Sequence, residues 1–132
     1  MGQQQLINIT LVVRDYDEAI DFYTRKLSFV LVEDTVLLPT KRWVRLRPPG
    51  NSSCCLLLGK AATPEQDKST GNQTGGRVFL FIETDDFRGD YQKLIDHQVT
   101  IVRPPRQETY GTVAVFADLY GNLFDLIQPA TL

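Results

Sequence analysis

Alternating apolar and polar positions divide most of the chain into short predicted strands, and two longer segments have the apolar spacing of a helix. Helices are predicted at 15–27 and 85–97, and Asp15 is suited to cap the first of them. Strands are predicted at 6–13, 29–36, 42–47, 53–59, 77–84, 99–104, 111–118 and 122–128. The polar, glycine-rich stretch 60–76 is expected to be a long loop, with one turn of helix after Thr63-Pro64 as an option.

The order of these elements repeats at an offset of 71 residues, which is the difference between Asp86 and Asp15. The same offset relates Gly50-Asn51 to Gly121-Asn122. Each half is therefore predicted to be one βαβββ unit of an α+β fold. Residues 1–132 are expected to form a single domain of two modules. They comprise module 1 at about 6–59, the polar loop at 60–76 and module 2 at about 77–128.

Two such modules are expected to join their strands into one curved, eight-stranded mixed sheet around a cavity, with the helices on the convex face. Strand alternation then assigns side chains to the two faces. Val78, Leu80 and Ile82 are expected under the second helix. The side chains predicted to line the cavity include Asn8, Trp43, Arg45, Cys54, Leu56, Phe79, Phe81, Glu83 and Asp125.

Tyr110 is a further candidate for the lining, because the predicted loop 103–109 should carry it to the start of the seventh strand beside the pocket. Packing within the turn would explain this tyrosine equally well. His97, the one histidine of the chain, follows the second predicted helix and is expected to be exposed and far from the cavity. A Ser-His-Asp or Cys-His catalytic set is therefore not predicted.

Composition narrows the choice of partners. Hydrophobic residues make up 42% of the chain and the net charge is −2, so no basic surface indicates nucleic-acid binding. The N-terminus lacks the basic region of a signal peptide, and no apolar run reaches the length of a membrane span. A cytoplasmic protein without a membrane or nucleic-acid partner is expected. Its partners would be a small molecule or a second copy of itself.

Three motifs resemble those of the vicinal oxygen chelate superfamily, which includes glyoxalase I, extradiol dioxygenases and bleomycin resistance proteins. They are LVVRDYDEAIDFYTRKLSF, GGRVFLFIETDDFRGDYQKL and VFADLYGNLFDLIQ, and together they cover much of the chain. The resemblance implies the paired-module fold and a homodimer. It leaves the reaction open, because this superfamily contains lyases, isomerases, oxygenases and binding proteins on one scaffold.

The resemblance also implies metal ligands on the first strand of each module and on the last strand. Those positions fall on Asn8, Phe79 and Asp125. A phenyl ring cannot bind a metal ion and an amide is a poor ligand for zinc, nickel or iron. We therefore expect no cofactor, with a divalent metal as the less favoured alternative.

Asp125 then has two interpretations. It either forms an ion pair with Arg45 or Arg47, or it acts as the anchor or general base for a bound ligand. The favoured hypothesis for the protein is a metal-free binder that sequesters or senses a planar compound, for which an anionic group is one option. The alternative is an enzyme of the superfamily. It would be a lyase, isomerase or dioxygenase with an atypical metal set, or a metal-independent catalyst that uses Asp125 as its tentative catalytic residue.

Overall fold

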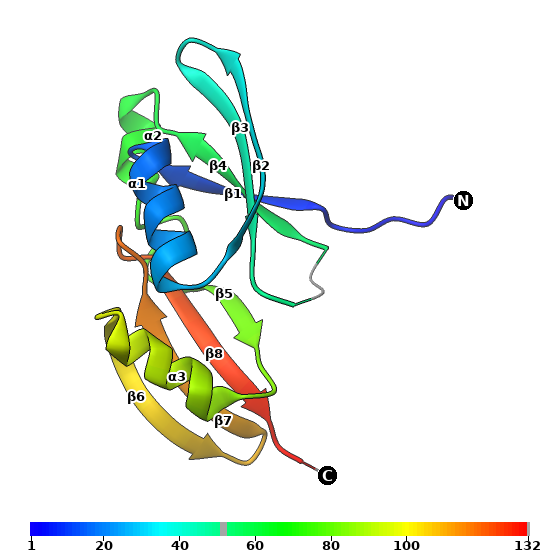
Figure 1. The fold of residues 1–132 in the computed structure, drawn as a ribbon, viewed down its shortest axis with the longest axis vertical. Helices are drawn as coiled ribbons and strands as arrows, with labels where there is room; N and C mark the ends of the chain where they lie inside the picture. The colour runs from blue at the N-terminus through cyan, green and yellow to red at the C-terminus, as the bar shows by residue number, and fades with distance from the viewer. Residues whose placement is uncertain (51–52, 132) are drawn as a thin grey trace. The chain divides into compact units, whose positions relative to one another are not determined.

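The computed structural model describes residues 1–50 and 53–131, which form two compact units, Met1–Thr70 and Gly71–Leu132 (Figure 1). Unit 1 contains β1 (Asn8–Val13), α1 (Tyr16–Asp21), the π-helical turn η1 (Phe22–Lys26), β2 (Val30–Leu38), β3 (Lys41–Arg47), β4 (Cys55–Lys60) and α2 (Pro64–Ser69). Unit 2 contains β5 (Val78–Glu83), α3 (Phe87–Asp96), β6 (Thr100–Glu108), β7 (Gly111–Ala117) and β8 (Leu123–Pro129). Asn51, used in the sequence comparison of the two halves, lies outside the described residues.

The α+β class and the two βαβββ modules are confirmed. The strands are hydrogen-bonded as two sheets of four, in the orders β1-β4-β3-β2 and β5-β8-β7-β6. In each sheet the first and last strands of the module pair in parallel, and the remaining pairs are antiparallel. The two sheets therefore have the same topology, as the internal repeat predicts.

Local sequence signals explain where the helices begin. The carboxylate of Asp15 accepts a hydrogen bond from the backbone N–H of Glu18 at 2.9 Å, which caps α1 as predicted. The predicted turn of helix in the loop 60–76 is α2, where the hydroxyl of Thr63 accepts from the backbone N–H of Gln66 at 3.1 Å. Pro64 stands in the first turn of α2, a position that suits its fixed φ.

The largest difference from the predicted elements is at residues 103–109, which were expected to form a loop. Strand β6 continues through Pro104 and Pro105 to Glu108. Proline is tolerated there because β6 is the edge strand of its sheet, and the pairing with β7 shifts between Arg103 and Arg106. The sequence predicts a strand end at the prolines because proline cannot donate a hydrogen bond in a central strand.

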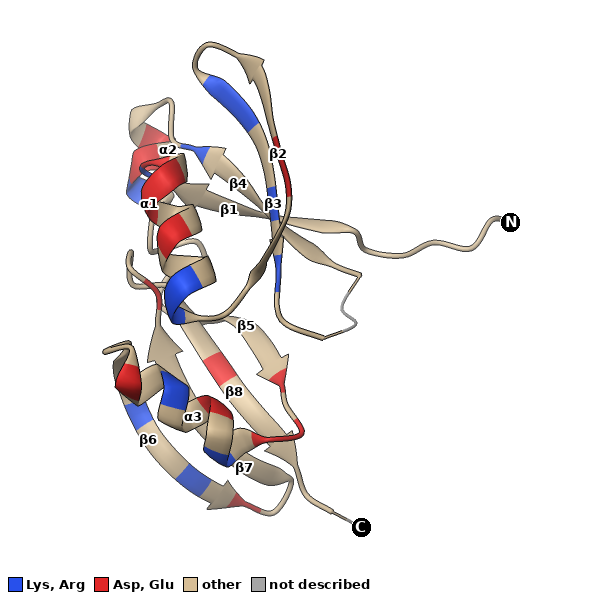
Figure 2. Cartoon of the chain, viewed as in Figure 1, with Lys and Arg blue, Asp and Glu red and all other residues tan. Residues whose placement is uncertain are grey.

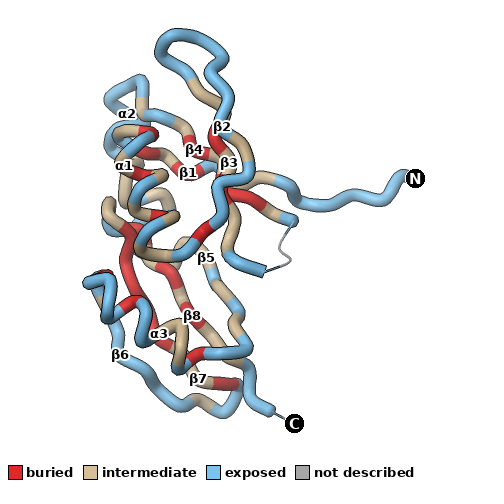
Figure 3. The backbone as a smooth tube through the Cα atoms, viewed as in Figure 1, coloured by how far each residue is buried: buried red, intermediate tan, exposed pale blue. Residues whose placement is uncertain are grey.

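The core of each unit lies between its sheet and its helix, where Figure 3 shows the buried segments. In unit 1, Leu11, Val13, Tyr23, Val44 and Leu46 are completely buried. In unit 2 the stacked rings of Phe116 and Phe124 lie 5.2 Å apart, and both side chains are buried. None of the helices formed by residues 1–50 and 53–131 is long and apolar enough to cross a membrane.

Candidate functional site

A connected group of polar side chains lies on the face of the unit 1 sheet that is turned away from α1, which we call open face 1. Nε of Arg45 donates to Oδ1 of Asn8 at 2.9 Å, and Nη1 of Arg45 lies 3.7 Å from Oε1 of Glu33. The same Glu33 oxygen accepts from Nε1 of Trp43 at 3.1 Å. The structure thus brings together three predicted site residues, from β1 and β3, through an acid on β2.

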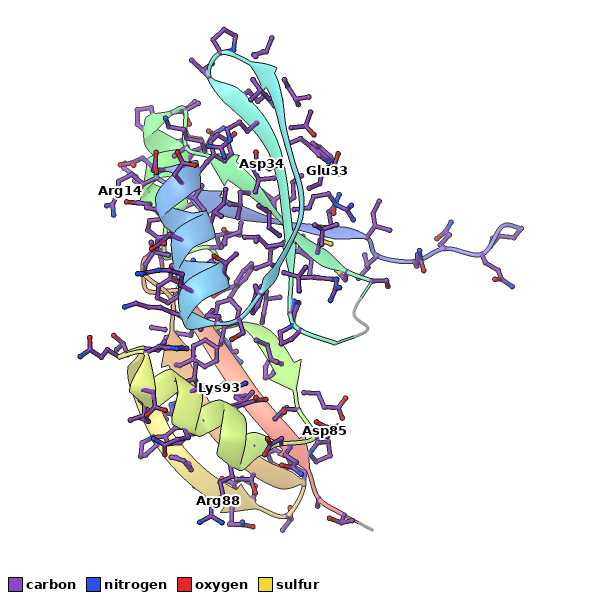
Figure 4. All side chains as sticks on the ribbon, viewed as in Figure 1. Arg14, Glu33, Asp34, Asp85, Arg88 and Lys93 are labelled. Atoms are coloured by element: carbon purple, nitrogen blue, oxygen red, sulfur yellow. The ribbon has the colours of Figure 1, made fainter. Side chains whose placement is uncertain are left out.

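Glu33 was not among the predicted site residues. Its position follows from the antiparallel pairing of β2 with β3, which sets Glu33 directly opposite Arg45. The neighbouring residue Asp34 points to the other side of β2 (Figure 4), where its carboxylate pairs with Arg42 at 2.7 Å. Arg42 also pairs with Asp17 on α1 at 2.8 Å, which places that group on the helix side. The two acids of β2 therefore serve opposite faces of the sheet. Figure 2 shows the acidic segment of β2 beside the basic segments of β3.

The register of β4 differs by one residue from the predicted alternation. Leu56 pairs with Leu46 and is buried, so it faces α1 and does not belong to open face 1. Leu57 pairs with Arg45, and Cys55 pairs with Asn8. Because paired residues in a sheet point to the same side, Cys55 and Leu57 replace the predicted Cys54 and Leu56 on this face.

In unit 2, a row of four paired residues crosses the face of the sheet turned away from α3, which we call open face 2. Phe81 on β5 pairs with Asp125 on β8, Asp125 pairs with Val115 on β7, and Val115 pairs with Arg103 on β6. The Phe81 side chain is 69% exposed. Open face 2 therefore has an exposed aromatic ring directly beside the acid of the last strand.

The Asp125 carboxyl lacks a partner for one of its oxygens. Oδ1 is buried and accepts no hydrogen bond from the described residues. Burial raises the pKa of Asp125 above its ordinary value, and the positive charge of Arg103 opposes that rise. The two arginines expected to pair with this acid find partners in unit 1. Arg45 binds Asn8 and Glu33, and Arg47 donates to the carbonyls of Pro48 and Gly50.

Phe79 does not lie where simple strand alternation predicts it, which is on the same face as Phe81. The pairing of β5 with β8 shifts between Val78 and Leu80, so that Val78 pairs with Leu123 and Leu80 pairs with Phe124. The ring of Phe79 meets the buried ring of Phe124 edge-on, with centroids 6.2 Å apart. Val78 therefore lies on open face 2, at the place where the sequence predicts Phe79.

The remaining predicted residues lie near the ends of strands. Glu83, at the end of β5, is exposed and pairs in register with Ile127. Tyr110 is 58% exposed in the turn between β6 and β7, and its carbonyl accepts from the backbone N–H of Ala130 at 2.9 Å. His97 caps the end of α3 and is exposed, as predicted.

The residues at the metal positions implied by the resemblance do not suit a divalent ion. Oδ1 of Asn8 already accepts from the Arg45 guanidinium, whose positive charge would repel a metal ion there. Phe79 has no donor atom. Within residues 1–50 and 53–131, no three side chains of His, Cys, Asp or Glu are grouped so that they could hold a metal. Of the residues at the three positions, Asp125 is thus the one whose side chain binds divalent metal ions well.

Comparison with known proteins gives a consistent result. A relative from Shewanella frigidimarina (strain NCIMB 400), an uncharacterised protein, is 56% identical over 127 residues, covering 96% of this chain and 94% of the relative. The solved structure of UcmS2 is 29% identical with a TM-score of 0.82, covering 96% of this chain and 98% of that chain. TnmS3, an antibiotic binding protein from Streptomyces sp. CB03234, is 28% identical with a TM-score of 0.81, covering 98% and 99%.

The family itself is recognised over nearly the whole length of the chain. A model of the Glyoxalase/Bleomycin resistance protein/Dioxygenase superfamily matches residues 5–126, which include module 1, nearly all of module 2 and the acid of the last strand. The chain belongs to the Glyoxalase/Bleomycin resistance protein/Dioxygenase superfamily.

Proposed function

We propose that the protein is a metal-free, small-molecule-binding member of its superfamily that sequesters or senses a planar compound. The observation that carries this proposal is the hydrogen bond from Arg45 to Asn8, because a guanidinium then engages the amide at the position that the resemblance implies for the first metal ligand. Phe79 supports the same conclusion, since its ring packs against Phe124 and offers no ligand atom. The similarity to an antibiotic binding protein supports binding as the activity.

The open faces have the composition that a binder of planar compounds requires. Trp43 on open face 1 is held by its hydrogen bond to Glu33, and Phe81 on open face 2 is exposed. Aromatic side chains supply a large apolar surface and stack with flat ligands. These two rings are the residues to which we assign the apolar contacts of the ligand.

The proposed binder acts in the cytoplasm as a homodimer. Strand β2 supports the dimer, because it is an edge strand whose apolar side chains are largely exposed, including Val36 at 70% and Leu38 at 58%. Light scattering coupled to size-exclusion chromatography measures the mass directly. A monomer at micromolar concentration would contradict the dimer without affecting the proposal of ligand binding.

Metal analysis tests the proposed function. Protein purified without chelators or metal-affinity columns is examined by elemental analysis and titrated calorimetrically with zinc, nickel, manganese and ferrous iron. We expect less than stoichiometric metal and no binding of micromolar affinity. One metal per chain, lost in Asp125→Asn, would instead favour the enzyme hypothesis with an atypical ligand set.

Ligand binding has a built-in reporter, because Trp43 is the only tryptophan in the chain and lies on open face 1. A library of planar aromatic compounds is screened for quenching of the Trp43 fluorescence, and hits are confirmed by calorimetry. Saturable binding at a stoichiometry of one per chain is expected. A library without any saturable hit would contradict the binding function.

A further inference from the structure

The pairing of an exposed ring with an unsatisfied acid on open face 2 indicates what kind of ligand this protein takes. Phe81 and Asp125 are directly opposite each other on neighbouring parallel strands. Paired side chains stand about 5 Å apart on the same side of a sheet. A flat ligand on the Phe81 ring therefore places a substituent at its edge within reach of the Asp125 carboxyl.

The Asp125 carboxyl is short of donors. An ionised carboxylate only accepts hydrogen bonds, and Oδ1 receives none from the described residues. The residue as a whole is only half-buried, and rotation about the terminal bond of the side chain exchanges its two oxygens. A ligand hydroxyl or amine at this edge would donate a hydrogen bond to the carboxylate oxygen that faces it.

The charges around the open faces disfavour an anion. On open face 1 the charge of Arg45 is balanced by Glu33. On open face 2 the cation in the row is Arg103, which is exposed and separated from Asp125 by the whole width of β7. The positive charge of Arg103 lowers the pKa of Asp125, but burial of the carboxyl has the larger effect and raises it. A ligand carboxylate beside Phe81 would therefore face the like charge of Asp125, which the exposed Arg103 offsets only in part.

We propose that the ligand is a planar aromatic compound that is uncharged or cationic, and that it stacks on Phe81 while a hydroxyl or amine group donates a hydrogen bond to Asp125. This inference rests on the proposed binding function and replaces the anionic option considered from the sequence. Asp125 is then the residue that selects the ligand by charge. Phe81 supplies apolar contact area, which contributes to binding equally for ligands of different charge.

Three probes that share one ring system distinguish charge selection by Asp125 from apolar contact with Phe81. They are 9-(aminomethyl)anthracene as the cation, 9-anthracenemethanol as the uncharged donor and anthracene-9-carboxylate as the anion. Binding is measured by the fluorescence anisotropy of the probe and by calorimetry at neutral pH. We expect the amine and the alcohol to bind at least about tenfold more tightly than the carboxylate, as a hydrogen bond to a charged group implies.

Two variants assign the selectivity. In Asp125→Asn, the amine and the carboxylate should bind within about threefold of each other, because the neutral amide removes the charge but keeps the shape. In Phe81→Ala, all three probes should weaken together. Asp85→Asn, at an exposed acid outside the row, is the matched control and should keep the wild-type order of affinities.

The outcomes distinguish this inference from the proposed function. A carboxylate probe that binds as tightly as the amine, or selectivity that persists in Asp125→Asn, would overturn the assignment of ligand class and leave the binding function in place. Failure of all three probes to bind the wild-type protein would also overturn the assignment of the ligand class. The library screen with Trp43 would then decide the binding function separately.

Discussion

Oδ1 of Asn8 accepts a hydrogen bond from Nε of Arg45 at 2.9 Å, which joins the first strand of unit 1 to its third strand across β4. The amide at the position that the resemblance implies for the first metal ligand is therefore engaged by a guanidinium. A metal ion at the same place would have to displace this cation or tolerate its charge.

Removing the arginine should destabilise unit 1 modestly. In Arg45→Met, Asn8 and Glu33 lose a charged partner while the apolar stem is kept. We expect a loss of about 1 kcal/mol in the free energy of unfolding, because both partners remain within reach of water. Urea denaturation measures it. Arg25→Met, which removes an exposed pair with Asp21, is the control, and an equal loss there would contradict a specific role for Arg45.

The two phenylalanines of β5 should differ in their contribution to stability. Phe79→Ala removes a ring that packs against the buried Phe124, so we expect a loss of about 2 kcal/mol. Phe81→Ala removes a ring that is 69% exposed and should cost about 0.5 kcal/mol or less. Thermal and urea denaturation of both variants test the register shift. The reverse order would show that Phe81, and not Phe79, contributes to the core.

The raised pKa of Asp125 gives a pH-dependent effect on stability. The folded protein holds this proton more tightly than the unfolded chain, so the contribution of Asp125 is most favourable below its ordinary pKa of 3.8 and is lost as the pH rises through the folded value. Asp125→Asn should therefore gain stability relative to the wild type as the pH is raised from about 3.8. Paired urea denaturations across that range measure the difference, and a constant difference would contradict the shift.

The turn before β8 should be sensitive to the loss of one acid. Oδ1 of Asp118 accepts from the backbone N–H groups of Tyr120 and Asn122 at 2.9 Å, and its other oxygen accepts from the Asn122 amide. Asp118→Ala should cost about 2–3 kcal/mol because it leaves buried donors unpaired. Asp96→Ala removes one exposed hydrogen bond and is the control in the same denaturation assay.

Two glycines in the segment that follows α2 provide a matched test of backbone packing. Both Gly71 and Gly75 have positive φ, at 75° and 66°, and a side chain at Gly71 would overlap the carbonyl oxygen of Tyr120. A side chain at Gly75 would meet nothing within 4 Å. Gly75→Ala should cost about 1 kcal/mol and Gly71→Ala clearly more, since the obstruction is backbone. Similar unfolding midpoints for the two variants would contradict the close approach at Tyr120.

The two βαβββ modules, the helix start at Asp15 and the position of the acid on the last strand follow from the sequence, which also offers the turn of helix after Thr63 as an option. Each of these is set by local chemistry or by a repeat, so that a few neighbouring residues carry the signal. The charge and the spacing of the apolar residues also led to a small molecule as the expected partner. The roles of the individual site residues remain predictions that the proposed experiments address.

Tertiary contacts set the register of the strands, and the register determines which side chains share a face. A two-residue turn after Leu38 would, without the register shift between Val36 and Leu38, set Glu33 opposite Leu46 instead of Arg45. A similar shift carries Phe79 toward the core, and one residue of register exchanges Cys54 for Cys55. Because side chains alternate along a strand, a slip of one residue moves each of them to the opposite face. Packing against the helix and the neighbouring strands determines the register, and no short stretch of sequence encodes it.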